Sequence, residues 1–219
     1  MFVKICGTTS EADALLAVAV DADAVGFIFA PSTRQVSPSI ARDIAKRLPR
    51  EILTVGVFRD EAPERVAQIV SQTALIGAQL HGSESPAVVK QVAASVRFVI
   101  KGFRAGSPAV REAASFGADC ILIDAPSPGS GELFDWSLAA EVPDGVRLML
   151  AGGLTPDNVA DAVAFVQPWA VDVSSGVEAA PGRKDPVRLR AFIANAKAVP
   201  LPEPRLFEGE RPYDWRLDG

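Results

Sequence analysis

The chain has 219 residues, of which 48% are hydrophobic, and its formal net charge is −5. This length is typical of a single α/β barrel domain, and the negative charge excludes a broad electrostatic attraction to nucleic acid or to an anionic membrane surface. The only cysteines are Cys6 and Cys120 and the only histidine is His81, which excludes a disulfide framework and a His/Cys metal cluster.

These features predict a cytoplasmic protein without a metal or an organic cofactor. A magnesium site made only of carboxylates stays open, although no acidic spacing suggests one. The first residues lack the apolar segment of a signal peptide. The most apolar stretch, residues 12–30, is interrupted by Asp13, Asp21 and Asp23, which argues against a membrane span.

Short apolar runs alternate with amphipathic segments along almost the whole chain. The runs are nearly continuous in hydrophobic residues, as in parallel strands that are buried on both faces. The predicted strands are Val3–Cys6, Ala24–Phe29, Leu53–Phe58, Ile76–His81, Arg97–Gly102, Cys120–Asp124, Arg147–Ala151 and Ala170–Val173.

The segments between these runs carry recognisable helix starts, in which a capping side chain or a proline precedes an apolar periodicity. A last helix is predicted over Asp185–Val199, and only a short one over Asp135–Glu141, after the sixth strand. The other expected starts are Ser10, Ser37-Pro38, Pro63 and Thr155-Pro156.

Eight strand–helix units without a linker predict a single (β/α)8 TIM barrel over residues 1–198. A doubly wound sheet would want a G-x-G-x-x-G fingerprint at its first turn, which Cys6-Gly7-Thr8-Thr9-Ser10 does not supply. Residues 199–219 contain four prolines and no helical pattern, and we predict a short proline-rich C-terminal extension there.

Cys6 and Asp124 end the first and sixth predicted strands, where active residues of barrels lie. From position alone, Cys6 could equally be a small buried core residue and Asp124 a helix cap or a solvated loop residue. A helix N-terminus after Cys6 would lower the pKa of its thiol and make it a base. Burial at the barrel mouth would favour protonated Asp124, a general acid. Cys120 begins a strand and is predicted to be core.

Glycine-rich segments follow the seventh and eighth strands. Barrels frequently bind phosphate between these two loops through backbone N–H groups, although such glycines can also only make tight turns. The candidate phosphate-binding residues are Gly152, Gly153, Ser174, Ser175 and Gly176.

The candidates for substrate binding lie in the loops after the first, second and fourth strands. Arg34 is either a surface residue or a guanidinium for a substrate carboxylate. Gln79 and His81 alternate toward one face of their strand, so both are expected to line the mouth, with a structural role for His81 equally open. Gly7 lets the backbone turn after Cys6.

Taken together, these segments resemble phosphoribosylanthranilate isomerases from Val3 to about Ala198. Each segment alone is weakly specific, whereas their order and spacing are highly specific. The segments are 4–9, 26–29, 32–38, 55–58, 79–82, 122–124, 129–131, 134–136, 152–159, 171–178 and 181–185.

The resemblance implies an Amadori rearrangement of N-(5-phosphoribosyl)anthranilate in tryptophan biosynthesis. Under it, Asp124 protonates the furanose ring oxygen, the Cys6 thiolate removes the C2 proton, and Arg34 holds the anthranilate carboxylate. The partner is a small sugar phosphate, and the family is compatible with a monomer or a homodimer. Pro128 before Gly129-Ser130-Gly131 and Glu132-Leu133 depart from the family pattern, which affects the expected closure of that loop.

Two alternatives remain at this stage. The analogous isomerisation in histidine biosynthesis uses a related barrel with aspartate at the position of Cys6, so Cys6 argues against it without excluding dual specificity. A non-catalytic phosphate-binding barrel would have lost the acid–base pair, and both Cys6 and Asp124 are present. Turnover of the two substrates, as opposed to mere stabilisation by a ligand, separates these hypotheses.

Overall fold

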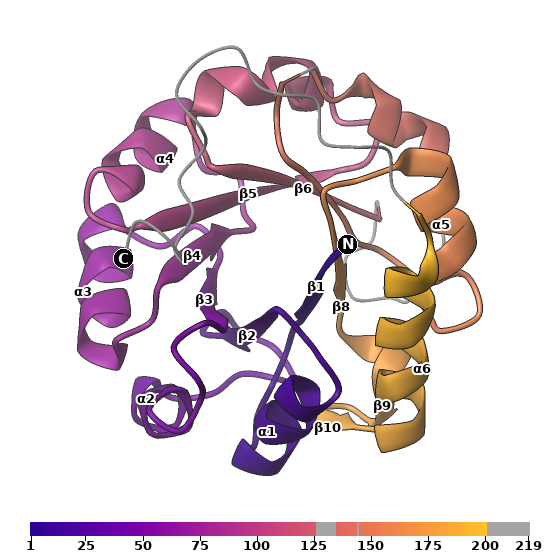
Figure 1. Cartoon of the computed structure of the whole chain (residues 1–219). Helices are drawn as coiled ribbons and strands as arrows, with labels where there is room; N and C mark the ends of the chain where they lie inside the picture. Colours follow the sequence, from indigo (N-terminus) through magenta and orange to yellow (C-terminus); the bar gives the residue numbers. More distant parts are fainter. Residues whose placement is uncertain (126–134, 144, 201–219) are drawn as a thin grey trace.

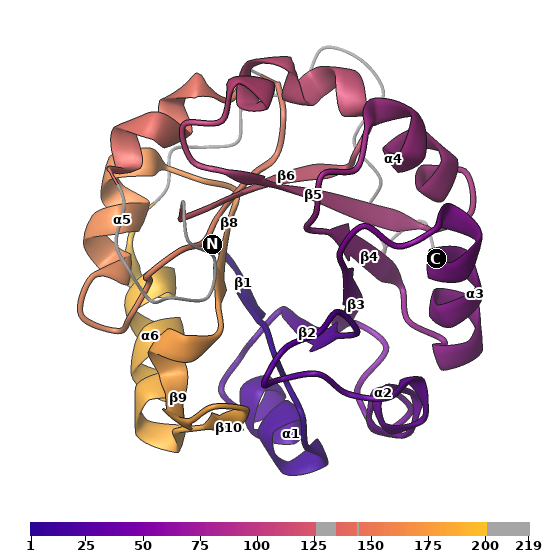
Figure 2. The same ribbon diagram turned by 180° about the vertical axis from the view of Figure 1, so that it is seen from behind.

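A closed barrel of eight parallel strands forms the centre of the molecule, and helices surround it (Figures 1 and 2). The computed structural model describes residues 1–125, 135–143 and 145–200. Neighbouring strands follow one another in sequence from β1 to β8, and β8 pairs with β1 to close the ring. This confirms the predicted (β/α)8 TIM barrel.

All eight predicted strands are present, with ends that differ by a few residues. Cys6 and His81 lie just beyond their strands and therefore begin the loops of the barrel mouth. The strands are β1 (Phe2–Ile5), β2 (Ala24–Ile28), β3 (Leu53–Phe58), β4 (Gly77–Leu80), β5 (Phe98–Arg104), β6 (Cys120–Asp124), β7 (Leu148–Leu150) and β8 (Ala170–Val173).

The outer ring combines α-helices with 3-10 helices. The α-helices are α1 (Glu11–Ala19), α2 (Pro38–Ala45), α3 (Pro63–Thr73), α4 (Pro86–Ala93), α5 (Val159–Val166) and α6 (Pro186–Ala198). Three 3-10 helices span Pro108–Phe116, Trp136–Glu141 and Ser175–Val177. A small antiparallel hairpin, β9 (Glu178–Ala180) and β10 (Arg183–Lys184), follows β8 and was not predicted.

Most predicted helix starts agree with the structure, and one is wrong. Ser10 and Ser37 cap α1 and α2 through their side chains. The helix expected from Thr155 begins only at Val159. The side chain of Asn158 explains the delay, because it accepts a hydrogen bond from Thr155 N and donates one to Gly153 O, which holds these residues in a loop.

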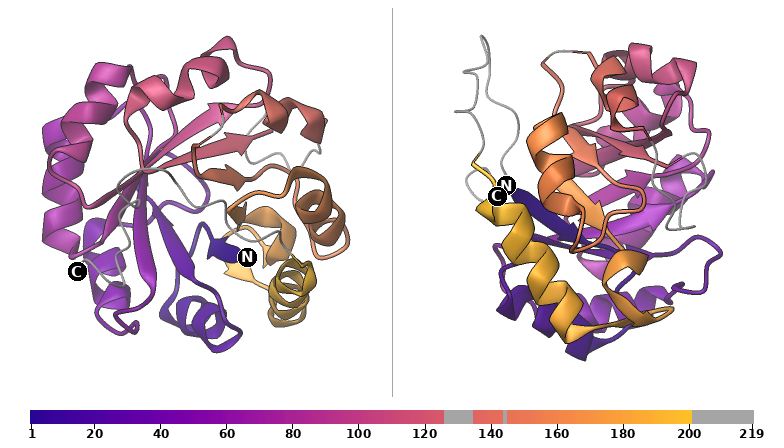
Figure 3. Two further views of the ribbon diagram at one scale, coloured as in Figure 1. Left: turned by 45° about the horizontal axis from the view of Figure 1, so that its top comes forward. Right: turned by 90° about the vertical axis from the view of Figure 1, so that its right-hand side faces the viewer.

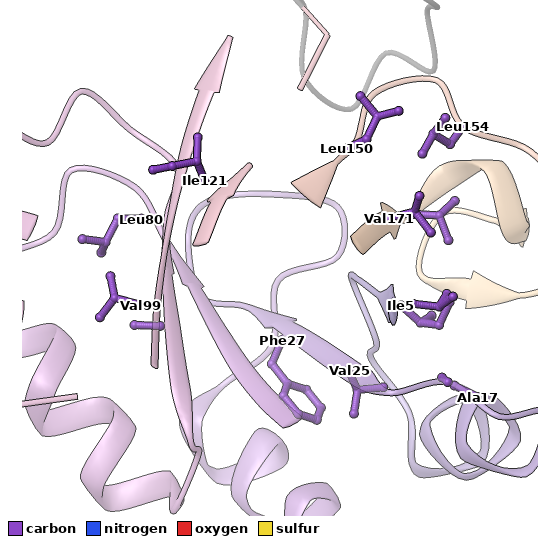
Figure 4. Close-up of a cluster of buried hydrophobic side chains, with 14 of the residues drawn as sticks. Ile5, Ala17, Val25, Phe27, Leu80, Val99, Ile121, Leu150, Leu154 and Val171 are labelled. Carbon is purple, nitrogen blue, oxygen red and sulfur yellow. The ribbon is translucent and has the colours of Figure 1, made fainter. Parts of the chain in front are cut away.

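Strand residues alternate between the barrel interior and the layer below the helices. Figure 4 shows part of the outer layer, where Ile5, Val25, Val99 and Ile121 belong to the same buried cluster as Ala17 of α1. The interior forms a separate cluster, and Cys120 belongs to it, as predicted for a core residue. That interior cluster consists of Phe2, Ala24, Leu53, Val55, Phe98, Ile100, Cys120, Leu122, Met149, Ala151 and Ala170.

The N-terminus and the end of α6 lie near each other at one end of the barrel (Figure 3). Helix α6 ends at Ala198, and the predicted extension falls almost entirely on residues 201–219, which lie outside the described residues. The boundary between residues 198 and 199 therefore stays a prediction. Within the described ranges, no helix has the length and apolarity needed to cross a membrane.

Candidate active site

Asp124 ends β6 as the last member of a hydrogen-bonded chain that begins on β4. Its Oδ2 lies 3.2 Å from His81 Nε2, and its Oδ1 accepts a hydrogen bond from Ala125 N. His81 Nδ1 lies 2.9 Å from Gln79 Nε2. An amide nitrogen only donates, so Nδ1 is the acceptor and Nε2 carries the hydrogen that faces Asp124. The structure thus brings together the predicted residues Gln79, His81 and Asp124.

The position of His81 depends on a buried ion pair on the outer side of the barrel wall. Lys101 Nζ lies 2.8 Å from Glu84 Oε2, and both side chains are 2% exposed. The same ammonium donates to the carbonyls of Leu80 and Gly82, which flank His81 in the chain. Lys101 is therefore saturated with acceptors, and it fixes the backbone on both sides of the imidazole.

Two further contacts complete this support. Lys101 Nζ also donates to Gly102 O, and a Cβ added at Gly102 would lie 2.7 Å from His81 Nδ1. The imidazole therefore rests directly on the backbone of β5, where only glycine leaves room. Glu84 accepts from the backbone N of Asp60 and of Gly82, which joins the loops after β3 and β4.

Cys6 lies above a second buried ion pair, and this one is inside the barrel. Lys4 Nζ is 2.8 Å from Asp172 Oδ1, and Lys4 is fully buried. Lys4 and Cys6 are two residues apart on the same strand and share a face. A Cβ added at Gly26 would lie 3.0 Å from Cys6 Sγ and 3.1 Å from Lys4 Nζ. The sulfur and the ammonium thus converge on the space above Gly26.

The environment of the Cys6 thiol differs from the expected one. Burial raises the pKa of Cys6, while the positive charges of Lys4 and Lys184 lower it and Asp172 raises it, and the net direction is upward. The expectation of a pKa lowered by the helix N-terminus is therefore wrong. Helix α1 begins only at Glu11, and the nearby cations oppose the burial without overcoming it.

Arg34 faces Glu178, the first residue of β9. Its Nε lies 2.8 Å from Glu178 Oε1 and its Nη2 lies 2.7 Å from Glu178 Oε2. Burial would raise the pKa of Glu178, but hydrogen bonds from Arg34 and the charge of Lys184 bring it below its usual value. Glu178 thereby occupies the Nε and Nη2 side of the guanidinium. Any further carboxylate would have to approach the other side of Arg34.

Lys184 joins this pair to the loops after β1 and β8. Its Nζ donates to Cys6 O, to Ser174 O and to Glu178 Oε1. Burial lowers the pKa of Lys184, and Glu178 only partly opposes this effect. The ammonium therefore connects the loop of Cys6, the loop of Ser174 and the partner of Arg34.

The glycines of the loops after β7 and β8 occupy positions that larger residues could not take. Gly152 and Gly153 have positive φ angles of 83° and 64°. A Cβ at Gly152 would collide with Ala125 N, and one at Gly176 would collide with Leu154 O. The loop after β7 is thus packed between its neighbours on both sides, and larger residues would push the backbones apart.

Ser174 supplies a polar group without a partner in this loop pair. Its Oγ is buried and has no hydrogen-bond partner among the described residues. A Cβ added at Gly7 would lie 2.7 Å from this oxygen and 2.6 Å from Arg34 Cδ. Gly7, Arg34 and Ser174 are therefore neighbours, and a buried hydroxyl without a partner suits an anion that accepts its hydrogen. Ser175 begins the adjoining 3-10 helix.

Six charged residues at this site were not predicted, namely Lys4, Glu84, Lys101, Asp172, Glu178 and Lys184. Two of them, Lys4 and Asp172, could have been recognised as charged residues inside strands that are otherwise apolar. Lys4 interrupts Val3-Lys4-Ile5-Cys6 and Asp172 interrupts Val171-Asp172-Val173, although both strands are otherwise apolar. A charge inside a strand that is buried on both faces needs a partner, and the register places Lys4 opposite Asp172.

No group of three or more His, Cys, Asp or Glu side chains in the described ranges is placed to hold a metal ion. The predicted loop of Pro128, Gly129-Ser130-Gly131 and Glu132-Leu133, which follows β6, lies outside the described residues.

Comparison with known proteins identifies the family. The family of N-(5'-phosphoribosyl)anthranilate (PRA) isomerases matches residues 3–195. The chain belongs to this family. An N-(5'-phosphoribosyl)anthranilate isomerase of Desulforudis audaxviator is 46% identical over 202 residues, which are 89% of this chain and 97% of the relative. The PRA isomerase of Thermotoga maritima is 45% identical over 203 residues, 90% of this chain and 98% of the relative.

Solved structures of PRA isomerases have the same fold. The enzyme of Thermus thermophilus superposes with a TM-score of 0.85 at 42% identity, covering 90% of this chain and 99% of that one. A PRA isomerase in complex with reduced 1-(o-carboxyphenylamino)-1-deoxyribulose 5-phosphate has a TM-score of 0.78 at 40% identity, covering 91% and 100%. This chain is accordingly an isomerase of tryptophan biosynthesis, as its sequence predicted.

Proposed function

We propose that Cys6 and Asp124 are the base and the acid that isomerise N-(5-phosphoribosyl)anthranilate. The observation that carries the assignment is that Asp124 ends β6 and Cys6 directly follows β1 at the same mouth, each beside its own polar or charged network. Asp124 contacts His81, whereas Cys6 lies beside Lys4. A proton can therefore be delivered on one side of the substrate and removed on the other.

The reaction then proceeds by proton transfers alone. Protonated Asp124 gives its proton to the ring oxygen, the bond between that oxygen and C1 breaks, and the nitrogen lone pair forms the C=N bond of a Schiff base. The Cys6 thiolate takes the C2 proton, and the electron pair of that C–H bond forms the C1=C2 bond of an enolamine. Addition of a proton at C1 and loss of the C2 hydroxyl proton give the ketone and restore both groups.

His81 orients Asp124 in this scheme. The Nε2–H donor faces one carboxyl oxygen, and Gln79 determines which imidazole nitrogen carries the hydrogen. Gln79 Oε1 is buried and without a partner among the described residues.

The two ends of the substrate are held by separate groups. Arg34 holds the anthranilate carboxylate with the side of its guanidinium that Glu178 leaves free. The phosphate lies between the loops after β7 and β8, with donors from the backbone of Gly152, Gly153, Ser175 and Gly176 and from Ser174. A small sugar phosphate in the cytoplasm is thus the ligand, and a monomer or a homodimer suits the site equally. One related structure is of generated monomers of a dimeric phosphoribosylanthranilate isomerase from Thermotoga maritima.

The decisive experiment follows the loss of anthranilate fluorescence with freshly generated substrate. Wild type is expected to accelerate the decay, while Cys6→Ser and Asp124→Asn each reduce the rate by about 10²-fold or more without loss of folding. Cys120→Ala is the matched control, because Cys120 is also buried but belongs to the barrel core. Its turnover should stay close to that of wild type.

Wild-type turnover in Cys6→Ser would refute the assignment of the base. Turnover of the histidine-pathway substrate in place of this one would redirect the proposal to that reaction. Ligand-induced thermal stabilisation without turnover of either substrate would indicate a binding protein.

A further inference from the structure

Lys4 and Asp172 form a charged pair in the interior of the barrel, directly below the proposed base. Residues 4 and 172 are opposite each other in the pairing of β1 with β8, and their side chains meet at 2.8 Å. Lys4 is 0% exposed. A pair with this burial contributes little net stability compared with apolar side chains of the same volume, because both charges lose their hydration. The main effect of the Lys4–Asp172 pair is therefore on the neighbouring groups that its charges reach.

The sulfur of Cys6 is the nearest such group. Gly26 on β2 faces both atoms, and its missing side chain leaves the space in which Cys6 Sγ and Lys4 Nζ meet. An ammonium has three hydrogens to donate. Asp172 accepts one, and Cys6 Sγ and Lys4 Nζ lie 3.0 Å and 3.1 Å from the same point, the position that a Cβ on Gly26 would take. The charge of Lys4 is thus directed at the atom that has to become an anion.

The other charges around Cys6 do not supply the same contact. Lys184 reaches the backbone oxygen of Cys6 and not its sulfur. The guanidinium of Arg34 is paired with Glu178. Asp172 is negative and opposes a thiolate. Lys4 is therefore the cation whose charged end shares the space above Gly26 with the sulfur.

We propose that Lys4, held in place by Asp172, is the positioning residue that favours the thiolate form of Cys6, the form required of the base. This inference rests on the proposed function, but its test needs no substrate. In physical terms, an opposite charge near the sulfur inside the barrel opposes the burial that favours the neutral thiol. The apolar barrel interior strengthens this attraction, because the local dielectric constant is low.

The test is a pH titration of the full chain by the ultraviolet absorbance of the thiolate, with Cys6→Ser as the blank. In Lys4→Met, the thiolate transition is expected at a pH higher by about one to three units, the usual effect of one close charge. The limb of the pH profile of kcat/KM that rises with ionisation of the base should move by the same amount. Cys120 is fully buried in the interior cluster and is common to all variants, so it does not contribute to the difference.

Two further variants keep the test decisive. Lys4→Met leaves Asp172 buried without a partner, so the chain can lose its fold. The double variant Lys4→Met/Asp172→Asn removes both charges with little change of volume, and its transition should still lie above that of wild type. Lys101→Met is the matched control, since it removes an equally buried lysine that does not face Cys6.

The outcomes are distinguishable. An unchanged transition in the folded double variant would overturn the inference, even if wild type catalyses the reaction. A displaced transition in a protein without turnover would support the role of Lys4 and contradict the proposed reaction. An equal displacement in Lys101→Met would show a general effect of lost charge and would also overturn the inference.

Discussion

The two sides of the barrel mouth use a buried lysine–carboxylate pair in different ways. On the side of β1 and β8, Lys4 lies inside the barrel and has one carboxylate acceptor, so part of its charge is directed at Cys6. On the side of β4 and β5, Lys101 lies outside and is surrounded by one carboxylate and three carbonyls. The comparison indicates that the first pair adjusts a charge, whereas the second holds a backbone.

The largest effect is expected from the pair outside the barrel. Lys101→Met leaves Glu84 buried without its cation, which should reduce the free energy of unfolding by about 3–5 kcal/mol. The double variant Lys101→Met/Glu84→Gln removes both charges and should recover most of this loss. Urea denaturation of wild type, Lys101→Met, Glu84→Gln and the double variant gives the coupling between the two sites. Equal stability of single variant and wild type would contradict the holding role.

Removal of Arg34 tests the other charged contact on the side of Cys6. Arg34→Ala should raise KM by about ten- to a hundredfold with a smaller change in kcat, because a hydrogen bond to a charged group contributes about 1.5–3 kcal/mol. Arg34→Lys should recover little, since lysine lacks the fork that pairs with Glu178. Arg42 on α2, whose side chain is 43% exposed and pairs with Asp43, provides the control, and Arg42→Ala should leave both constants unchanged. A fall in kcat alone would place Arg34 in the chemical step.

A smaller effect is expected within the hydrogen-bonded chain of Asp124. Gln79→Leu removes the donor to His81 Nδ1 and should lower kcat by roughly two- to tenfold, the effect of one hydrogen bond of about 0.5–1.5 kcal/mol. Steady-state kinetics at saturating substrate measure it. Gln91→Leu, which removes a surface hydrogen bond to Glu64, is the control. No change in Gln79→Leu would show that His81 keeps its orientation through the backbone alone.

The smallest effect concerns the pH dependence of stability at Glu178. Its pKa in the folded state lies below the usual value, so the charged form stabilises the fold. This contribution is present above the pKa of the unfolded state and is lost as the pH falls through that of the folded state. The stability difference between wild type and Glu178→Gln should therefore shrink upon acidification. Unfolding curves at several acidic pH values measure it, and a constant difference would contradict the pairing with Arg34.

The barrel was predictable from the sequence because each strand is a separate apolar run with its own turn and helix signals. Cys6, Asp124, Gln79 and His81 were found for the same reason, since the end of a strand determines the face and the height of a side chain. What the sequence did not predict depends on distant partners. One side of the Arg34 guanidinium is occupied by Glu178, which lies 144 positions away in the chain. The pKa of Cys6 is raised mainly by burial, which only the closed barrel creates.

Local sequence also misled at one helix. The proline after Thr155 is a valid start signal, yet Asn158 uses its side chain to hold the loop after β7, so the helix begins at Val159. Residues 155–158, which the structure leaves in the loop after β7, were thus taken for the first turn of a helix. An asparagine whose side chain bonds to the preceding backbone, and not to the helix that follows, distinguishes a loop from a helix start at such a position.

The separation of Lys4 and Asp172 by 168 residues has a consequence for how the protein is made. Lys4 on β1 leaves the ribosome before its partner on β8, which emerges only after seven of the eight strands. Until β8 pairs with β1, Lys4 and Cys6 lie on an open sheet edge, exposed to water and to other chains. The environment of the base therefore forms in the last step of barrel closure, and a truncated or nascent chain carries an ordinary cysteine.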